Sequence, residues 1–179
     1  QAGMISRAMY SWWDVDAEVA PYYVPIRTFV YQGERMPLWY GILGFMDFVM
    51  ESPHSSKVVH YPGWFAYQTI AQTFHDRREF SMPAFSIDSS NGATLYLKAY
   101  ERPGKELLII LWGRDRSGLV TDIHIPSNGY GYPVRLNLLN HEEWIDVAST
   151  REGDGVTLRD VPLGLSPTII RLFPAELVK

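Results

Sequence analysis

The sequence predicts an α+β chain in which a segment of mixed helix and strand, residues 1–80, precedes an all-β sandwich, residues 81–179. Two observations support this prediction. Apolar residues recur at helical spacing in the first part, and after residue 80 the chain becomes a series of short apolar runs separated by Gly, Pro and Asn. A chain of 179 residues has room for one domain or two small ones.

The first part begins with apolar residues at positions i, i+3, i+4 and i+7 of residues 1–13, which predict a helix. Natural domains seldom open on an uncapped helix, so we expect this start to be a cut. Residues 24–31 are rich in β-branched and aromatic side chains and predict a strand. Residues 38–50 fit a strand or a short helix equally, and the polar residues 52–60 predict a loop.

A second helix is predicted from Pro62 to Phe74, because proline suits the first helical position and an apolar stripe follows it. The rest of the chain predicts a sandwich of eight strands. Residues 102–105 resemble a hairpin turn, and residues 107–112 are apolar on both faces, as in a central strand. The predicted strands are 84–87, 94–101, 107–113, 120–125, 134–139, 144–149, 156–161 and 168–173.

Composition and charge exclude several classes of function. The formal net charge is −4 and no Lys/Arg cluster stands out, so no nucleic-acid partner is expected. No apolar run is long enough to span a bilayer, so no membrane partner is expected either. The absence of cysteine excludes disulfides and thiolate chemistry, and leaves the compartment open between secreted and cytoplasmic.

Four short phrases resemble the C-terminal part of (β/α)8-barrel retaining glycoside hydrolases of the cellulase, xylosidase and β-glucanase superfamily. The opening of residues 1–8 resembles the helix after the seventh barrel strand, and residues 61–69 resemble the start of the last helix. Residues 155–158 and 166–172 resemble the closing strands of the β-sandwich that many of these enzymes append. The resemblance implies the last βα segment of a TIM-type barrel, with residues 28–31 in the eighth strand, followed by an antiparallel β-sandwich.

The resemblance also implies a chemistry and a partner. Enzymes of this type cleave O-glycosidic bonds of poly- or oligosaccharides with two carboxyl groups about 5 to 5.5 Å apart. Both would lie upstream of Gln1, so this chain is expected to contain no catalytic residue. The incomplete barrel would then need the missing N-terminal barrel portion, or a homo-oligomer, to cover it.

The acids and histidines of the chain offer no replacement active site. Asp14 and Asp16 lack the glycine and terminal glutamate of a calcium loop. Glu142 and Glu143 are adjacent, so they point to opposite faces of a strand. The five histidines have no metal-binding spacing. No cofactor and no metal are therefore expected.

The expected carbohydrate contacts lie after the strand at residues 24–31. Trp and Tyr rings stack on the apolar faces of sugars, and polar neighbours bind the hydroxyl groups. Ordinary core packing competes with this interpretation for the two aromatic residues. The candidate substrate-binding residues are Tyr31, Gln32, Glu34, Arg35 and Trp39.

The predicted function is therefore that of a C-terminal glycoside hydrolase fragment whose catalytic Glu residues lie outside the chain. One alternative is a non-catalytic carbohydrate-binding module, which would need several exposed, coplanar aromatic rings. The other is a purely structural or interaction domain, which the lack of a polar constellation in the sequence favours.

Overall fold

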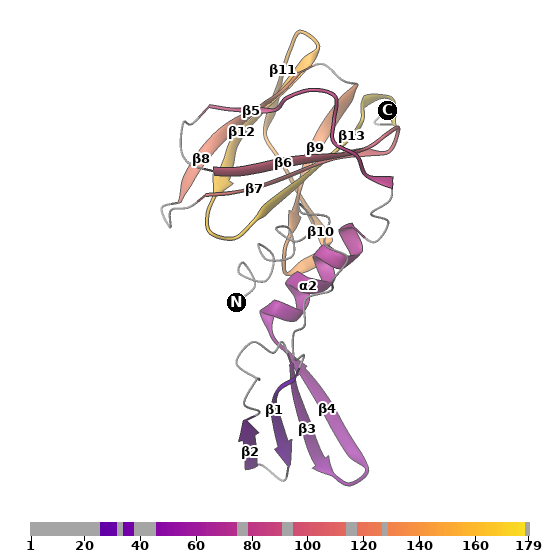
Figure 1. Cartoon of the computed structure of the whole chain (residues 1–179), viewed down its shortest axis with the longest axis vertical. Coiled ribbons are helices and arrows are strands. Elements are labelled where there is room, and N and C mark those ends of the chain that lie inside the picture. Colours follow the sequence, from indigo (N-terminus) through magenta and orange to yellow (C-terminus); the bar gives the residue numbers. More distant parts are fainter. Residues whose placement is uncertain are drawn as a thin grey trace. The chain divides into compact units, whose positions relative to one another are not determined.

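The computed structural model of the chain describes residues 26–31, 34–37, 46–74, 79–90, 95–113, 118–126 and 129–177. The chain divides into two compact units, Gln1–Ala71 and Gln72–Lys179, and Figure 1 shows the elements of both. Among the described residues, no helix is both long and apolar enough to cross a bilayer.

The first unit is built around a four-stranded sheet. Its strands lie in the order β2, β1, β3, β4, and β1 and β3 run parallel whereas both outer pairs are antiparallel. All six residues of β4 are exposed, and β4 lies at an edge of this sheet. The strands are β1 (Ile26–Tyr31), β2 (Glu34–Pro37), β3 (Met46–Ser52) and β4 (Ser55–His60).

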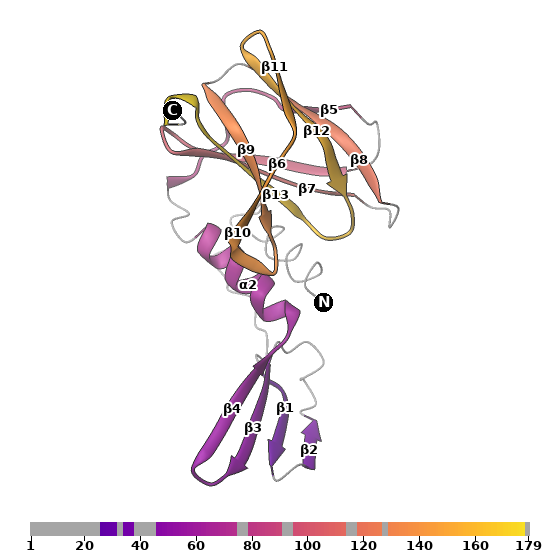
Figure 2. The same ribbon diagram turned by 180° about the vertical axis from the view of Figure 1, so that it is seen from behind.

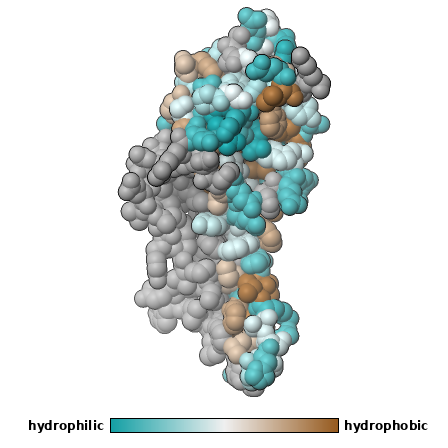
Figure 3. All heavy atoms as spheres, turned by 90° about the vertical axis from the view of Figure 1, so that its right-hand side faces the viewer, coloured by the Kyte–Doolittle hydropathy of each residue, from teal (hydrophilic) through white to brown (hydrophobic). Residues whose placement is uncertain are grey.

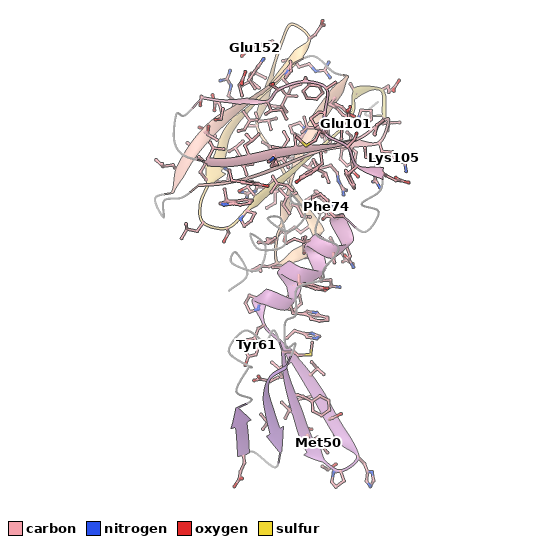
Figure 4. All side chains as sticks on the ribbon, viewed as in Figure 1. Met50, Tyr61, Phe74, Glu101, Lys105 and Glu152 are labelled. Carbon is pink, nitrogen blue, oxygen red and sulfur yellow. The ribbon has the colours of Figure 1, made fainter. Side chains whose placement is uncertain are left out.

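A helix, α2 (Pro62–Thr73), follows directly after β4. Its first residue is proline, which has no N–H to leave unpaired in the first turn. The Tyr61 hydroxyl donates a hydrogen bond to Asp47 Oδ2 at 2.6 Å, and the Trp64 ring stacks on His60 with centroids 4.7 Å apart. The start of the helix is thereby fixed to β3 and β4 (Figure 4).

The second unit is a sandwich of two antiparallel sheets (Figures 1 and 2). One sheet has the strand order β10, β9, β13, β7, β6, and the other has the order β11, β12, β8, β5. The elements are β5 (Asp88–Ser89), β6 (Leu95–Arg102), β7 (Glu106–Gly113), β8 (Leu119–Ile125), β9 (Tyr130–Asn137), β10 (Asn140–Asp146), β11 (Ser149–Glu152), β12 (Gly155–Leu163), β13 (Thr168–Pro174) and the 3-10 helix η3 (Ala175–Leu177).

Alternate side chains of the inner strands form the core between the two sheets. Leu107, Ile109 and Leu111 of β7 face Leu158 of β12, and all four are completely buried. Each such side chain contributes about 1.5 to 3 kcal/mol to folding. On the face that Figure 3 shows, hydrophilic side chains cover much of the described surface, with hydrophobic ones among them.

The predicted α+β class, with the end of a TIM-type barrel as its first part, is wrong. In such a barrel every strand runs parallel to both of its neighbours and is followed by a helix. Here β1 turns back directly into the antiparallel β2, and β3 turns back into the antiparallel β4. The described residues therefore contain no βα barrel unit and are predominantly antiparallel β-structure.

Several single elements also differ from the sequence predictions. The predicted loop at residues 52–60 contains the strand β4, and the ambiguous segment 38–50 contains β3 from Met46 onward. Residues 84–87 form no strand, because the pairing with β8 begins at Asp88. The predicted strand 144–149 is divided between β10 and β11. The predicted helix at residues 1–13 lies outside the described residues.

Candidate functional site

The substrate-binding residues predicted from the sequence surround the β1–β2 hairpin. Tyr31 and Glu34 are paired across the two strands, and Arg35 is paired with Val30. Glu34 is exposed, and Gln32 and Trp39 lie outside the described residues. The hairpin thus brings together the backbone of three of the five residues, although not at the end of a barrel strand as expected.

A second group of polar side chains, which the sequence analysis did not single out, lies on the outer face of the four-stranded sheet of the sandwich. Strand pairing places Asp88 of β5 beside His124 of β8, and His124 beside Thr157 of β12. These three residues, with Ser90, Asp122 and Arg159, line a cavity of about 300 Å³. We call this cavity the polar pocket.

Arg159 holds one side of the polar pocket in place. Its guanidinium donates to Asp122 Oδ2 at 2.6 Å, to Glu152 Oε1 at 2.9 Å and to Thr150 Oγ1 at 3.2 Å. The hydrogen bond from Arg159, together with one from the Asp160 backbone N–H, lowers the pKa of Asp122. Asp122 is therefore a fixed carboxylate and is unsuited to act as a general acid.

The other side of the polar pocket is open to a ligand. Among the described residues, no hydrogen bond or ion pair involves the Asp88 carboxylate, which is exposed. His124 Nδ1 lies 3.1 Å from Thr157 Oγ1, which leaves the ring nitrogen Nε2 for another partner. Asp88 and His124 thus offer a carboxylate and an imidazole side by side on neighbouring strands.

A glycine makes room for the imidazole. A Cβ atom at Gly155 would lie 3.1 Å from His124 Cε1 and 3.0 Å from the Ile125 carbonyl oxygen. Gly155 follows the two-residue loop of the β11–β12 hairpin, and Glu152, labelled in Figure 4, precedes it. Gly153, the first loop residue, has φ 62°, the conformation that type II′ hairpins require there.

The chemistry of the polar pocket suits binding through hydrogen bonds. Carboxylates accept from hydroxyl groups and the guanidinium donates to them, and such charge-assisted bonds are the stronger ones. No group of three His, Cys, Asp or Glu residues within the described ranges is arranged to hold a metal ion. Three carboxylates, those of Asp88, Asp122 and Glu152, outnumber the single guanidinium.

Sequence reasoning missed this pocket because its residues lie far apart in the chain. Asp88 and Asp122 are separated by a hairpin that belongs to the opposite sheet, and Arg159 follows another such hairpin. Each residue alone resembles the polar, solvent-facing position of an ordinary strand. The signal that could have found them is the alternation of β8, in which Asp122 and His124 fall on the same face.

Comparisons with known proteins give little further guidance. No protein family matches the sequence, and no curated protein matches it. Among solved structures, the chain is similar to alpha-L-fucosidase isoenzyme 2 from Paenibacillus thiaminolyticus, with 5% sequence identity and a TM-score of 0.38. The similarity covers 59% of this chain and 16% of that chain. This weak similarity to a glycoside hydrolase identifies neither a family nor an activity, and the domain boundary after residue 80 stays a prediction.

Proposed function

We propose that this chain is a non-catalytic, carbohydrate-binding part of a glycoside hydrolase, and that the polar pocket of the sandwich holds the sugar. One observation carries the proposal. The polar pocket combines two residues with unused hydrogen-bonding capacity, Asp88 and His124, and one fixed ion pair, that of Asp122 and Arg159. Such a mixture of acceptors and donors matches the hydroxyl groups of a pyranose ring. No Trp, Tyr or Phe among the described residues lines the polar pocket, so the proposed binding rests on hydrogen bonds and not on the aromatic platform expected from the sequence.

The resemblance of the sandwich strands to those of retaining glycoside hydrolases supports the same assignment. The two phrases that carry it, residues 155–158 and 166–172, fall largely in β12 and β13. Strand β12 supplies Thr157 and Arg159 to the polar pocket. The activity of the whole enzyme would then reside in a catalytic domain that these residues accompany.

The lowered pKa of Asp122 favours binding over catalysis. A retaining mechanism needs one carboxyl group that is protonated at working pH and can donate a proton. The hydrogen bond from Arg159 lowers the pKa of Asp122, and Arg159 also binds Glu152. Asp122 is therefore held in the charged form that accepts hydrogen bonds.

Isothermal titration calorimetry of the full chain with cellotetraose and with xylotetraose tests this function. We expect binding that Asp88→Asn weakens by roughly tenfold, since the neutral amide loses the charge-assisted bonds. Asp154→Asn is the matched control, because Asp154 is exposed in the β11–β12 turn of the same sheet and does not line the polar pocket. No binding of either sugar, or equal affinities for the two variants, would refute the proposal.

A further inference from the structure

A second cavity, of about 230 Å³, lies on the other side of Arg159. Arg159 lines both this cavity and the polar pocket. The polar side chains of the second cavity are Arg135, Asp146 and Asp160, and apolar side chains, including Val147 and Pro162, complete it. We call this cavity the edge cleft; its residues come from β9, β10 and β13 of one sheet, from β12 of the other sheet and from the link between β10 and β11.

Backbone hydrogen bonds fix the edge cleft to both sheets. The Val147 N–H donates to the Pro133 carbonyl at 3.2 Å, which ties the β10–β11 link to the five-stranded sheet. The Arg159 N–H donates to the Ala148 carbonyl at 2.7 Å, which ties the same link to β12. The backbone around the edge cleft is therefore held in place by hydrogen bonds to both sheets.

A bulge in β12 positions the residue shared by the two cavities. The pairing of β12 with β8 shifts register between Leu158 and Val161, and Asp160 within that shift has φ 52°. Non-glycine residues seldom adopt this conformation, and Asp is one of the few that do. The Asp160 N–H donates to Asp122 Oδ1 at 3.1 Å, which holds the bulge next to the polar pocket. Bulges of this kind often occur where a strand redirects a functional side chain.

The edge cleft has the amphipathic lining that a sugar ring needs. Among the described residues, no hydrogen bond or ion pair involves the Arg135 guanidinium or the Asp146 carboxylate. Both can therefore bind hydroxyl groups, while Val147 and Pro162 offer apolar surface to the C–H face of a ring. The cleft is lined by two guanidinium groups, those of Arg135 and Arg159, and by the two carboxylates of Asp146 and Asp160, so its charges balance. The excess of carboxylates in the polar pocket disfavours an anionic ligand.

We infer that the edge cleft and the polar pocket are two subsites of one binding site, joined at Arg159, so that the ligand is a neutral oligosaccharide and not a single sugar. This inference rests on the proposed function. Each cavity would hold one sugar unit, and the linkage between the units would pass over the Arg159 guanidinium. The guanidinium is already fixed by Asp122 and Glu152, so little conformational entropy is lost on binding.

Titrations of the full chain with glucose, xylose, cellotetraose and xylotetraose test the inference, with Asp146→Asn and Arg135→Gln as variants and Asp154→Asn as the control. We expect a tetrasaccharide to bind at least about tenfold more tightly than its monosaccharide. Each cleft variant should weaken tetrasaccharide binding by roughly tenfold, and the control should not. Thermal unfolding checks that the variants remain folded.

The outcomes separate the two proposals. If Asp88→Asn weakens tetrasaccharide binding and the cleft variants leave it unchanged, the second subsite is refuted while the proposed function stands. If tetrasaccharide and monosaccharide bind equally well, the oligosaccharide inference is refuted in the same way. If none of the four sugars binds, both proposals are refuted together.

Discussion

Gly155 shows how a single residue controls the geometry of the polar pocket. A methyl group at this position would press on the Ile125 carbonyl oxygen at 3.0 Å and on His124 Cε1 at 3.1 Å. Backbone cannot give way there without disturbing the pairing of β12 with β8, in which Ile125 and Val156 are partners. The His124 ring would therefore have to shift within the polar pocket.

We expect Gly155→Ala to lower the free energy of unfolding by about 1 to 2 kcal/mol through overpacking. Denaturant unfolding measures the change. Gly118→Ala is the matched control, because no atom lies within 4 Å of a Cβ atom at Gly118. That variant should be as stable as the parent or slightly more stable, since alanine restricts the unfolded chain. Equal losses in both variants would contradict the prediction.

Tyr130 gives the sandwich a defined response to alkaline pH. Its hydroxyl donates to Glu101 Oε1 at 2.9 Å, and only 7% of the residue is exposed. Burial, followed by the hydrogen bond to Glu101, raises the pKa of Tyr130. The unfolded tyrosine ionises near pH 10, whereas the folded one keeps its proton. The stabilising effect is therefore complete below pH 10 and is lost as the pH rises through the folded pKa.

We expect Tyr130→Phe to be less stable at pH 7 by about 1 kcal/mol, because a hydrogen bond is lost. As the pH rises from 9 to 11, the free energy of unfolding of Tyr130→Phe should fall less than that of the parent. Phenylalanine has no proton to lose, so at this position the folded and unfolded states no longer differ in proton binding. Unfolding measured across that pH range tests both statements. Tyr132→Phe is the control, since Tyr132 is 53% exposed. Parallel pH profiles of the parent and Tyr130→Phe would show that Tyr130 has no such role.

At the scale of elements, local patterns predicted the existence of most strands and of the helix. The helix predicted from Pro62 to Phe74 is confirmed as α2, and the hairpin turn predicted at residues 102–105 is confirmed by the pairing of Arg102 with Glu106. The prediction of a central strand at residues 107–112 is also confirmed, because β7 lies between β13 and β6. These elements have strong periodic or turn signals of their own.

The errors arose where local pattern carries no information about pairing. The barrel was implied by short phrases that resemble a hydrolase family, and such phrases, being mostly apolar pattern, do not give the direction of the neighbouring strand. The polar sequence of β4, which includes Lys57, was interpreted as a loop. It is polar because an edge strand faces solvent, and charged residues protect such edges from further pairing.

The strands β6, β7 and β13 are linked by one buried acid. Glu106 of β7 is 2% exposed and forms ion pairs with Arg102 of β6 and Arg171 of β13. The Arg171 guanidinium also lies over the Trp144 ring, 4.2 Å from its centroid. Burial lowers the pKa of Arg171, and the negative charge of Glu106 opposes this effect.

We expect Glu106→Gln to destabilise the sandwich by about 2 to 4 kcal/mol, because two poorly solvated guanidinium groups lose their counter-charge. Glu51→Gln is the control, since the ion pair of Glu51 with Lys57 is exposed and contributes about 1 kcal/mol or less. Denaturant unfolding distinguishes the two cases. If both substitutions lower the free energy of unfolding by the same small amount, Glu106 and its two arginine partners have no special role in joining the strands.

At the scale of the whole molecule, the sequence predicted the sandwich but not the candidate site. The sandwich follows from eight runs with clear breaks, and its two sheets confirm that architecture. The polar pocket depends on which strands become neighbours, because Asp88 meets His124 only through the β5–β8 pairing. No local pattern in one sequence contains that information, so the site became visible only with the sheet topology.

The division of the chain leads to a prediction about independent folding. The core cluster of the sandwich runs from Ala99 to Leu172 and lies entirely within the second unit. Phe74 belongs to the same unit and packs against Tyr100 and Phe80, with ring centroids 5.9 and 5.6 Å apart. Residues 72–179 therefore contain both the core and the aromatic contacts at its border.

We expect a chain of residues 72–179 to fold alone and to unfold in one cooperative transition, because a core of this size suffices for a small domain. A chain of residues 79–179, which lacks Phe74, should be less stable by about 2 to 4 kcal/mol, the cost of losing a buried aromatic side chain. Circular dichroism during thermal unfolding compares the two. If residues 72–179 give no cooperative transition, the sandwich depends on the first unit, and carbohydrate binding must then be studied in the full chain alone.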